Sequence, residues 1–465
     1  MPVVCLISLA SVLTLLTLSE LSLGRVPDPG RLPDPSMHLP EIADWRIEME
    51  SALGVQTTDP LITAIIANDT EKLRSLLATG RSGAGVLSTD GATLVGLACI
   101  YHHPECLSLL LAHGGDPNKA GGPGSLTPLL DATTSKCHDC ISILLESGAD
   151  PNGLGGVQGN HMRMSPLANA AAANDVAAIE LLVKDGAAIN GPTGTTSPLI
   201  MAAVRCNIEA VHALLAHDAN PNTPTPNGSM TPLTSSARAA CPSIMNVLLS
   251  HGANPHGELH DGGTPLMQAA WWGSNGCVAV LLKHDPDFLA MDHAGHDAVM
   301  NAAIRGHEDV LRKLLNAGAQ ADRANARGWT PLMFAARNGS VVCLQTLMEH
   351  NASLNVTPDG WTPLKEAARN CHPKIVAILL AAGANAHYRD KCGWSALDDA
   401  AHYGCPECLN VLLESGGYDQ SAIRTAASRT QLHFTHPNVS KQHAARIEQC
   451  YTMLESHMTS DGKGN

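Results

Sequence analysis

Aromatic residues are scarce in this sequence. Phe, Trp and Tyr make up 3% of its 465 residues, although 44% of all residues are hydrophobic. Large rings supply much of the buried area of an ordinary globular core, so a core of that kind is not expected. The remaining apolar residues, mainly Leu, Ala, Val, Ile and Met, suit closely packed short helices. Because a single compact core rarely exceeds about 300 residues, the length predicts several domains or a repeat array.

Clustered positive charge is also missing. Lys and Arg total 29 against 43 Asp and Glu, which gives a formal net charge of −14 at pH 7. Proteins that bind nucleic acids concentrate Lys and Arg on one surface or along one segment. No such segment occurs here, so no nucleic-acid partner is expected.

Signature motifs of common enzyme classes are absent as well. The sequence has no Gly-x-Ser-x-Gly, no Walker-type Gly-Lys-Ser/Thr loop and no His-Glu-x-x-His. The segments outside the repeats described below reach only about 60 residues, which is short for a catalytic domain. We therefore expect no enzyme activity, catalytic residue, cofactor or metal site.

A repeated tripeptide organises most of the chain. Thr-Pro-Leu, Ser-Pro-Leu or a related tripeptide recurs at intervals of 32 to 38 residues, and a Leu-Leu pair keeps the same step. Two markers in phase over eleven units predict a solenoid of about eleven repeats at residues 59–419. The aligned positions are Pro60, Leu94, Pro128, Pro166, Pro198, Pro232, Pro265, Ala298, Pro331, Pro363 and Ala396.

Each unit is expected to form two short helices. Thr or Ser caps the first helix, and Pro at its first position loses no needed donor. An Ala-rich segment follows, as at 332–338, and then a break that is often glycine. The second helix carries the Leu pair, as at 376–382, and Gly-Ala-Asp/Asn ends it. Such a unit buries too little surface to fold alone, so stacking must stabilise it.

The segment GWTPLMFAARNGSVVCLQTLMEHNASLN at 328–355 resembles an ankyrin repeat. The family pattern is Gly-x-Thr-Pro-Leu-His, then Ala-Ala, Gly-His, Leu-Leu and Gly-Ala-Asp-x-Asn, and the resemblance covers roughly residues 59–418. The family His after Pro-Leu is absent from every unit and is replaced by Met at 267 and 333. The resemblance implies an all-α ankyrin-repeat solenoid with β-hairpin or turn fingers.

The same resemblance implies a function. Ankyrin-repeat proteins act as scaffolds or adaptors that bind a partner protein in a concave groove, and we expect this chain to do so as a monomer. The alternative is a substrate-recruiting adaptor of a larger enzyme complex, for example a ubiquitin-ligase-type assembly. That role would need an effector-binding segment, for which only 420–457 is available.

The N-terminal residues carry a separate pattern. Residues 3–18 are uncharged and apolar, so 1–24 is predicted to be a signal-peptide-like or signal-anchor segment. A wrongly assigned start codon is the third interpretation. A signal peptide would direct the chain to the secretory pathway; otherwise the cytoplasm is expected. A membrane contact is expected only if residues 3–18 remain as an anchor.

The other segments outside the array are short. Residues 25–42 are rich in proline and predict an extended linker, and 43–58 predict an N-terminal capping helix. Residues 420–457 are expected to form a degenerate closing repeat, and 458–465 a disordered tail.

Five cysteines share one register of the second helix, where Val or Ile stands in other units. Neighbouring helices lie about 8–10 Å apart, beyond the roughly 7 Å between the Cα atoms of a disulfide. We therefore predict buried, reduced thiols, which favour a reducing compartment. The spacing in Cys137-x-x-Cys140 and Cys405-x-x-Cys408 leaves a zinc or redox site as a weaker alternative. The five cysteines are Cys106, Cys140, Cys277, Cys343 and Cys408.

Five of the six tryptophans fall on one expected face of repeats 7 to 11. The resemblance implies that hairpin tips and first helices line the groove, and Trp, Tyr and Arg dominate interface hot spots. Arg beside Trp also points to a partner with an acidic segment. The other interpretation is that a Trp before Thr-Pro packs between hairpins, and the enlarged loop 152–163 is a second candidate surface. The candidate partner-binding residues are Trp271, Trp272, Trp329, Trp361, Trp394, Arg305, Arg337, Arg369, His402 and Tyr403.

Overall fold

The computed structural model describes residues 59–79, 93–121, 126–155, 164–355, 360–415, 417–434 and 441–460. The expected signal segment, linker and capping helix at 1–58 lie outside these residues, as do 156–163 of the enlarged loop and 461–465 of the tail. Within the described ranges the fold is all-α, without a named strand. Two isolated antiparallel β-bridges also occur, one between Gly121 and Leu126 and one between Gly155 and Met164.

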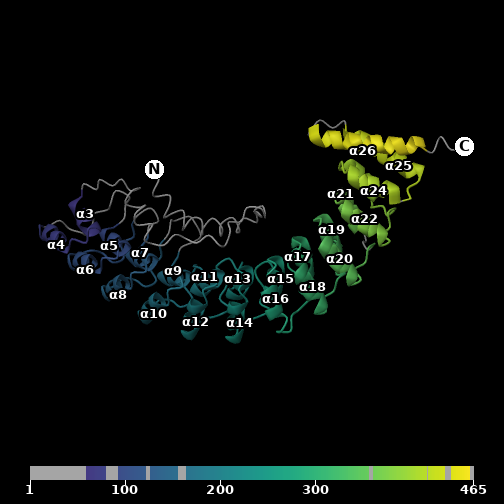
Figure 1. Cartoon of the computed structure of the whole chain (residues 1–465). Helices are drawn as coiled ribbons and strands as arrows, with labels where there is room; N and C mark the ends of the chain where they lie inside the picture. The colour runs from purple at the N-terminus through teal and green to yellow at the C-terminus, as the bar shows by residue number, and fades with distance from the viewer. Residues whose placement is uncertain are drawn as a thin grey trace. The chain divides into compact units, whose positions relative to one another are not determined.

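The chain divides into two units, one ending at Pro232 and the other beginning at Leu233. In the first unit the first helices of the repeats are α3 (Pro60–Ile66), α5 (Leu94–Ile100), α7 (Pro128–Ser135), α9 (Pro166–Ala172) and α11 (Pro198–Val204). The second helices are α4 (Thr70–Ala78), α6 (Pro104–Ala112), α8 (His138–Glu146), α10 (Val176–Lys184) and α12 (Ile208–Ala216). Each kind of helix packs on its own kind in the next repeat, which produces two layers (Figure 1).

The division of the chain falls at the start of α13 (Pro232–Arg238). The later first helices are α15 (Pro265–Trp271), α17 (Ala298–Arg305), α19 (Pro331–Arg337), α21 (Pro363–Arg369) and α23 (Ala396–His402). The second helices are α14 (Pro242–Ser250), α16 (Asn275–Leu281), α18 (Glu308–Asn316), α20 (Val341–Glu349), α22 (Pro373–Ala381) and α24 (Pro406–Ser415). Two longer helices follow, α25 (Gln420–Phe434) and α26 (Lys441–Ser460), and pack on α23 and α24.

The first helices begin as the sequence predicts. In α11 the Ser197 hydroxyl accepts the N–H of Ile200 at 3.2 Å, and in α15 the Thr264 hydroxyl accepts that of Met267 at 3.4 Å. Pro stands at the first position of both helices. The alanine pairs behind these caps, such as Ala335-Ala336, are fully buried, so the backbones of neighbouring first helices can approach closely.

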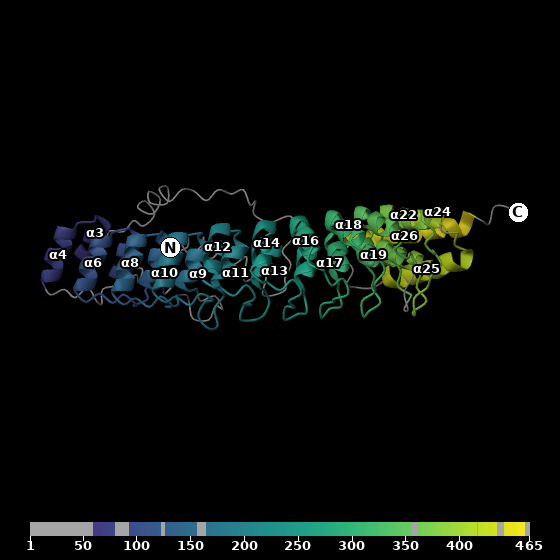
Figure 2. The ribbon, with the colours of Figure 1, turned by 90° about the horizontal axis from the view of Figure 1, so that it is seen from below.

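The turn between the two helices of a repeat places one residue in the left-handed region. Glycine fills this position in some repeats, such as Gly306 (φ 74°), and other residues fill it elsewhere, such as Ala240 (φ 56°). The residue that follows can bond the preceding repeat: the His307 ring donates from Nε2 to the Trp271 carbonyl at 3.1 Å. In the second unit, the turns between repeats extend beyond the helices along one edge (Figure 2).

The structure corrects one of the five cysteine predictions. Cys106, Cys277, Cys343 and Cys408 are buried free thiols, as predicted. Cys140 is buried but bonded to Cys137, and their Cα atoms are 5.2 Å apart. The bond forms inside one repeat, because Cys137 immediately precedes α8 and Cys140 lies in its first turn. The interhelical spacing on which the prediction rested does not limit this pair.

A second disulfide joins neighbouring repeats at non-equivalent positions. Cys371 lies in the turn after α21 and Cys405 immediately before α24, with Cα atoms 5.1 Å apart. The remaining thiols of the core stay protonated, since burial raises the pKa of Cys277 and of Cys408 to about 12. Among the described residues, no helix combines the length and the apolar character needed to cross a membrane.

Candidate functional site

All ten candidate residues lie in the second unit, on its first helices or directly beside them. Trp329, Trp361 and Trp394 stand two residues before their aligned repeat positions, and Arg337 and Arg369 stand six residues after theirs. We call the set the Trp/Arg strip: Trp271, Trp272, Trp329, Trp361, Trp394, Arg305, Arg337, Arg369, His402 and Tyr403.

Within a repeat, the strip pairs a tryptophan with a cation. The Arg337 Cζ lies 5.3 Å from the centre of the Trp329 ring, and the Arg369 Cζ lies 5.3 Å from that of Trp361. Each Arg ends its helix, and helical side chains lean toward the N-terminus, which brings the guanidinium back over the ring. In repeat 11 His402 takes the same register, and its ring centre lies 4.8 Å from that of Trp394.

Other pairs join consecutive repeats. The Arg305 Cζ at the end of α17 lies 5.0 Å from the centre of the Trp271 ring at the end of α15. Arg369 also lies 4.6 Å from the Tyr403 ring, so two rings cover one guanidinium. Within the described second unit, no ring contact joins the Arg305 pair to the Trp329 pair. The structure therefore brings the candidates together in groups, and not in one continuous stack.

The strip remains accessible. All five of its tryptophans are half-buried, Arg337 is exposed, and Arg305 and Arg369 are half-buried. Among the described residues these three guanidiniums contact rings and have no hydrogen-bond or ion-pair partner. Since a guanidinium carries five N–H donors, each remains able to bind a carboxylate.

Three cations outside the predicted set also contact these rings. Arg238 lies over Trp272 at 5.1 Å, Arg429 over Trp394 at 5.3 Å, and Lys365 near Trp361 at 5.7 Å. Arg238 occupies the register of Arg337, so repeat alignment could have found it. Arg429 lies on α25, where the repeat markers stop, and no local pattern indicates it.

Lys365 is fully buried beneath the strip. Its Nζ lies 3.0 Å from a carboxylate oxygen of Asp390 and 3.0 Å from one of Asp399, and it donates to the Trp394 carbonyl. The preceding three repeats have Met at this register, so a lysine at a position that is apolar in those repeats could have indicated a buried ion pair. The ion pairs link α21 to α23 and to the turn before it.

Buried carboxyl groups lie between these cations. Asp398 is 2.9 Å from Arg429 and 3.8 Å from Arg389. Burial raises the pKa of Asp399 to about 6, although Lys365 opposes this shift. Burial likewise raises the pKa of Glu366, and the charges of Arg369 and Arg337 oppose the rise.

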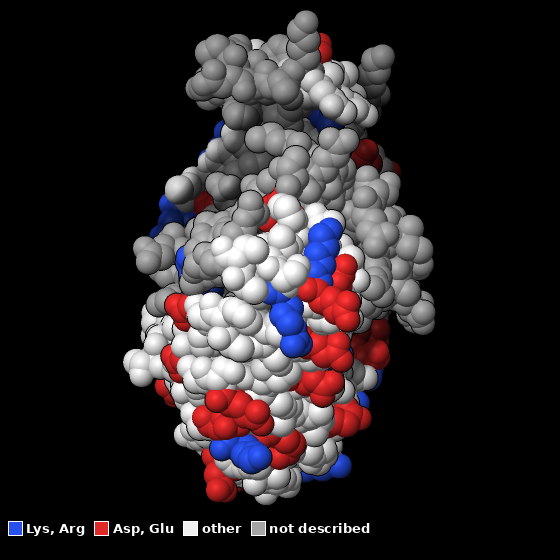
Figure 3. Space-filling view, turned by 90° about the vertical axis from the view of Figure 1, so that its left-hand side faces the viewer, with Lys and Arg blue, Asp and Glu red and all other residues white. Residues whose placement is uncertain are grey.

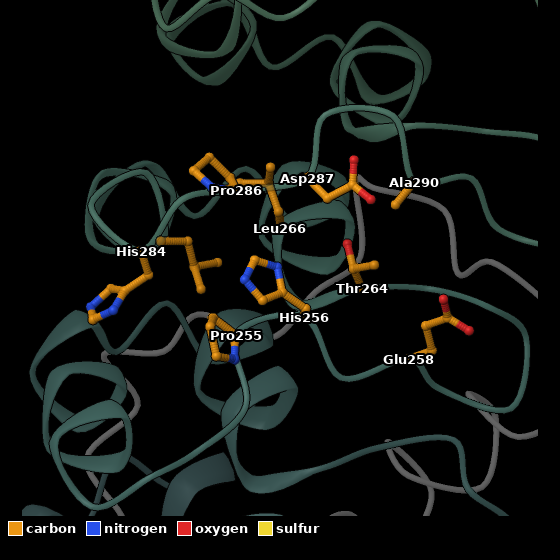
Figure 4. A pocket seen from close by; sticks show the side chains of 10 residues that line it. Pro255, His256, Glu258, Thr264, Leu266, His284, Pro286, Asp287 and Ala290 are labelled. Carbon is orange, nitrogen blue, oxygen red and sulfur yellow. The ribbon is translucent and has the colours of Figure 1, made fainter.

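A small pocket in the second unit is separate from the strip. It has a volume of about 160 Å³, and no strip residue lines it. Its lining comes from the turn after α14, from α15 with its N-cap and from the end of α16 with the following turn (Figure 4). His256, Glu258, His284 and Asp287 supply its charged or titratable groups.

The described surface is not basic in general. On the end of the first unit, Asp and Glu side chains gather along one flank with few Lys and Arg between them (Figure 3). Together with a net charge of −14, this makes the unpaired arginines of the strip a local feature.

Stacked two-helix repeats with Ala-rich first helices and half-exposed rings define a protein-interaction solenoid. A family model of ankyrin repeats (3 copies) matches residues 61–153, 266–358, 299–390 and 357–423. A second model, of ankyrin repeats (many copies), matches residues 199–240. The chain belongs to the ankyrin-repeat family.

Curated relatives share the repeats over part of their length. The ankyrin repeat protein nuc-2 of Neurospora crassa is 30% identical over 158 residues, which are 33% of this chain and 15% of that protein. Human ankyrin repeat and SOCS box protein 3 is 31% identical over 153 residues, 25% of this chain and 30% of the relative. The E3 ubiquitin-protein ligase XB3 of Oryza sativa subsp. japonica is 33% identical over 177 residues, 34% of this chain and 38% of the relative. The chain thus spans well under half the length of each of these relatives.

Proposed function

We propose that this ankyrin-repeat chain binds a partner protein through the Trp/Arg strip of its second unit and does not act as a catalyst. One observation carries the proposal: Arg305, Arg337 and Arg369 each lie against a tryptophan ring and use no donor within the described residues. Such rings are unusual in a chain with 3% aromatic residues. An accessible row of them is the kind of surface that a protein partner covers.

The ring contacts also favour binding energetically. A free arginine loses rotamer entropy when a partner immobilises it, and ordering a flexible side chain costs about 0.5–1.5 kcal/mol. A guanidinium already stacked on a ring has lost part of that freedom before the partner arrives. The half-buried rings add apolar area that a partner removes from water.

The test measures partner affinity and thermal stability for Trp271→Ala, Trp272→Ala and Trp361→Ala in the full chain. Affinity capture with the chain as bait supplies the partner, and titration calorimetry supplies the dissociation constants. We expect each variant at a hot spot to bind about thirtyfold more weakly, since truncating such a ring costs about 2 kcal/mol. Val342→Ala is the matched control, because Val342 is 47% exposed and lies on a second helix.

Unchanged melting with lost binding supports the proposal. If the variants melt earlier but retain the affinity of the folded molecule, the rings serve core packing and the proposal fails. The same holds if Val342→Ala weakens binding as much as the strip variants do.

A second function, recruitment of a substrate to a larger enzyme complex, draws on the relatives. XB3 is named an E3 ubiquitin-protein ligase and another relative carries a SOCS box in its name. If this chain is such an adaptor, captured complexes contain ubiquitin-ligase subunits. Trp361→Ala then loses the substrate and keeps those subunits; capture without any ligase subunit contradicts this role.

A further inference from the structure

We infer that the partner segment on the strip is an acidic peptide in the extended polyproline II conformation whose carboxylates recur every third residue, with two of them bound by Arg337 and Arg369. This inference rests on the proposed function and adds the chemistry of its ligand.

The repeat spacing determines the spacing of the carboxylates. Arg337 and Arg369 hold the same register at the ends of α19 and α21, and these two helices pack directly on each other. Neighbouring packed helices lie about 8–10 Å apart. A polyproline II chain advances about 3.1 Å per residue with three residues per turn, so side chains three residues apart share one face and lie about 9 Å apart. Steps of two or four residues give about 6 or 12 Å by the same rise and place the side chains on different faces of the peptide.

Both guanidiniums are prepared for such a ligand. Each is held against a tryptophan, with the Cζ 5.3 Å from the ring centre, and neither has an ion-pair partner among the described residues. A ring covers the face of a guanidinium and leaves its edge free. The edge carries the N–H donors that bind a carboxylate in a bidentate manner.

Within the described part of this region, the buried carboxylates form no ion pair with Arg337 or Arg369. Lys365 holds Asp390 and Asp399, and Arg429 holds Asp398 at 2.9 Å. The charges of Arg369 and Arg337 both act to lower the pKa of Glu366. The Glu366 side chain, however, is only 3% exposed and lies in the buried part of α21. Its carboxyl therefore lies below the surface at which a ligand meets the two guanidinium edges.

The repeats on either side of Arg337 and Arg369 carry basic side chains in similar positions, but these match the register or the charge less well. Arg305 lies one repeat before Arg337 and is shifted by one position, from the sixth to the seventh residue after the aligned position. His402 holds the register of Arg369 one repeat later and carries a full charge only when protonated. We therefore expect the two central arginines to contribute most of the affinity.

The experiment measures binding of labelled ten-residue peptides to the full chain by fluorescence anisotropy. One peptide carries Glu at its first, fourth, seventh and tenth positions in a Ser/Pro background, which favours polyproline II. Others of the same composition place Glu at every second residue or in one block. We expect the three-step peptide to bind at least about tenfold more tightly, with an affinity that falls as salt screens the charges. A helix-forming peptide with Glu every seventh residue spans a similar distance of about 10 Å and tests a helical ligand.

Two variants identify the residues. Arg337→Gln and Arg369→Gln should each weaken the three-step peptide about tenfold, the usual effect of losing a hydrogen-bonded charge. Lys283→Gln is the control. Lys283 is exposed just beyond α16, and its substitution removes one positive charge at a site away from the strip. Circular dichroism melts establish that the variants fold.

The outcomes separate this inference from the proposed function. Equal binding of all spacings, tighter binding of the helical peptide, or an equal loss in Lys283→Gln overturns the three-step ligand. If a natural partner still depends on Trp361 in that case, the strip is a binding surface for other chemistry. If neither the peptides nor the partner respond to the strip variants, both proposals fail.

Discussion

At the scale of single residues, Lys365 shows how a buried charge can be accommodated under a binding surface. Its ammonium group replaces the thioether of Met333 at the same register and is fully buried. Two carboxylates and a carbonyl surround it. A buried ion pair contributes little net stability, yet removing one partner leaves uncompensated charge.

Lys365→Met should therefore destabilise the second unit, although Met suits this register elsewhere. We expect the free energy of unfolding to fall by about 3–5 kcal/mol, because Asp390 and Asp399 lose their cation. Urea denaturation followed by tryptophan fluorescence measures the change. The double variant Lys365→Met/Asp399→Asn should recover part of the loss; a single variant as stable as the wild type contradicts the argument.

We expect Asp131 to make the stability of the first unit depend on pH. Its carboxyl lies against Gly96 of α5, and burial raises its pKa to about 7. An unfolded Asp titrates near pH 3.9. Because the folded pKa is the higher one, the protonated group's contribution is complete below about pH 4 and is lost as the pH rises through 7.

Asp131→Asn should remove this dependence. At pH 8 the variant should melt a few degrees above the wild type, and near pH 4 the difference should vanish, with an upper limit of about 4 kcal/mol. Calorimetric melts from pH 4 to 8 give the comparison. Parallel pH profiles for the two proteins would show that Asp131 is not the group responsible.

At the scale of the elements, the turn between the two helices of a repeat has one position whose backbone takes the left-handed conformation. Ala240 holds it with φ 56° and Gly306 with φ 74°. A side chain in the left-handed region costs about 1–2 kcal/mol, partly offset by the greater flexibility of glycine in the unfolded chain. A Cβ atom at Gly306 would meet only the Ser340 hydroxyl, at 3.7 Å.

Opposite substitutions should then have opposite effects. Ala240→Gly should raise the free energy of unfolding by up to about 1 kcal/mol, and Gly306→Ala should lower it by about 1 kcal/mol. Chemical denaturation of the two variants beside the wild type measures both. Changes of the same sign would mean that contacts, and not backbone conformation, decide stability at this turn.

At the scale of the whole molecule, stability should be local. Repeats contact only their neighbours, so a change in one unit need not alter the other. Five of the six tryptophans lie in the second unit, and fluorescence therefore reports mainly on that unit. Far-UV circular dichroism reports on the helices of both units.

The unfolding transitions reported by fluorescence and by circular dichroism should differ when the second unit is destabilised. In Lys365→Met we expect the fluorescence midpoint in urea to fall further than the circular dichroism midpoint, because helices of the first unit persist. Ala240→Gly serves as a stabilising control in the same unit. Coincident transitions in Lys365→Met would show that the chain unfolds as one cooperative block.

The repeats could be predicted because their causes are local. Ser197 caps the helix that begins one residue later, and Gly306 is the C-cap at which α17 ends. Such signals act over a few residues and recur in phase. The register of the strip follows from the same alignment, so its ten residues could be predicted from the sequence.

The pairings could not be predicted in this way. Lys365 meets Asp390 and Asp399, Arg369 meets Tyr403, and Cys371 bonds Cys405. These partners are 25 to 34 residues apart, and no short motif joins them. The sequence by itself determined the repeats, their helices and the residues that share a face. Only the tertiary structure decided which charges are paired internally and which guanidiniums remain available, because that depends on the distances between side chains of adjacent repeats.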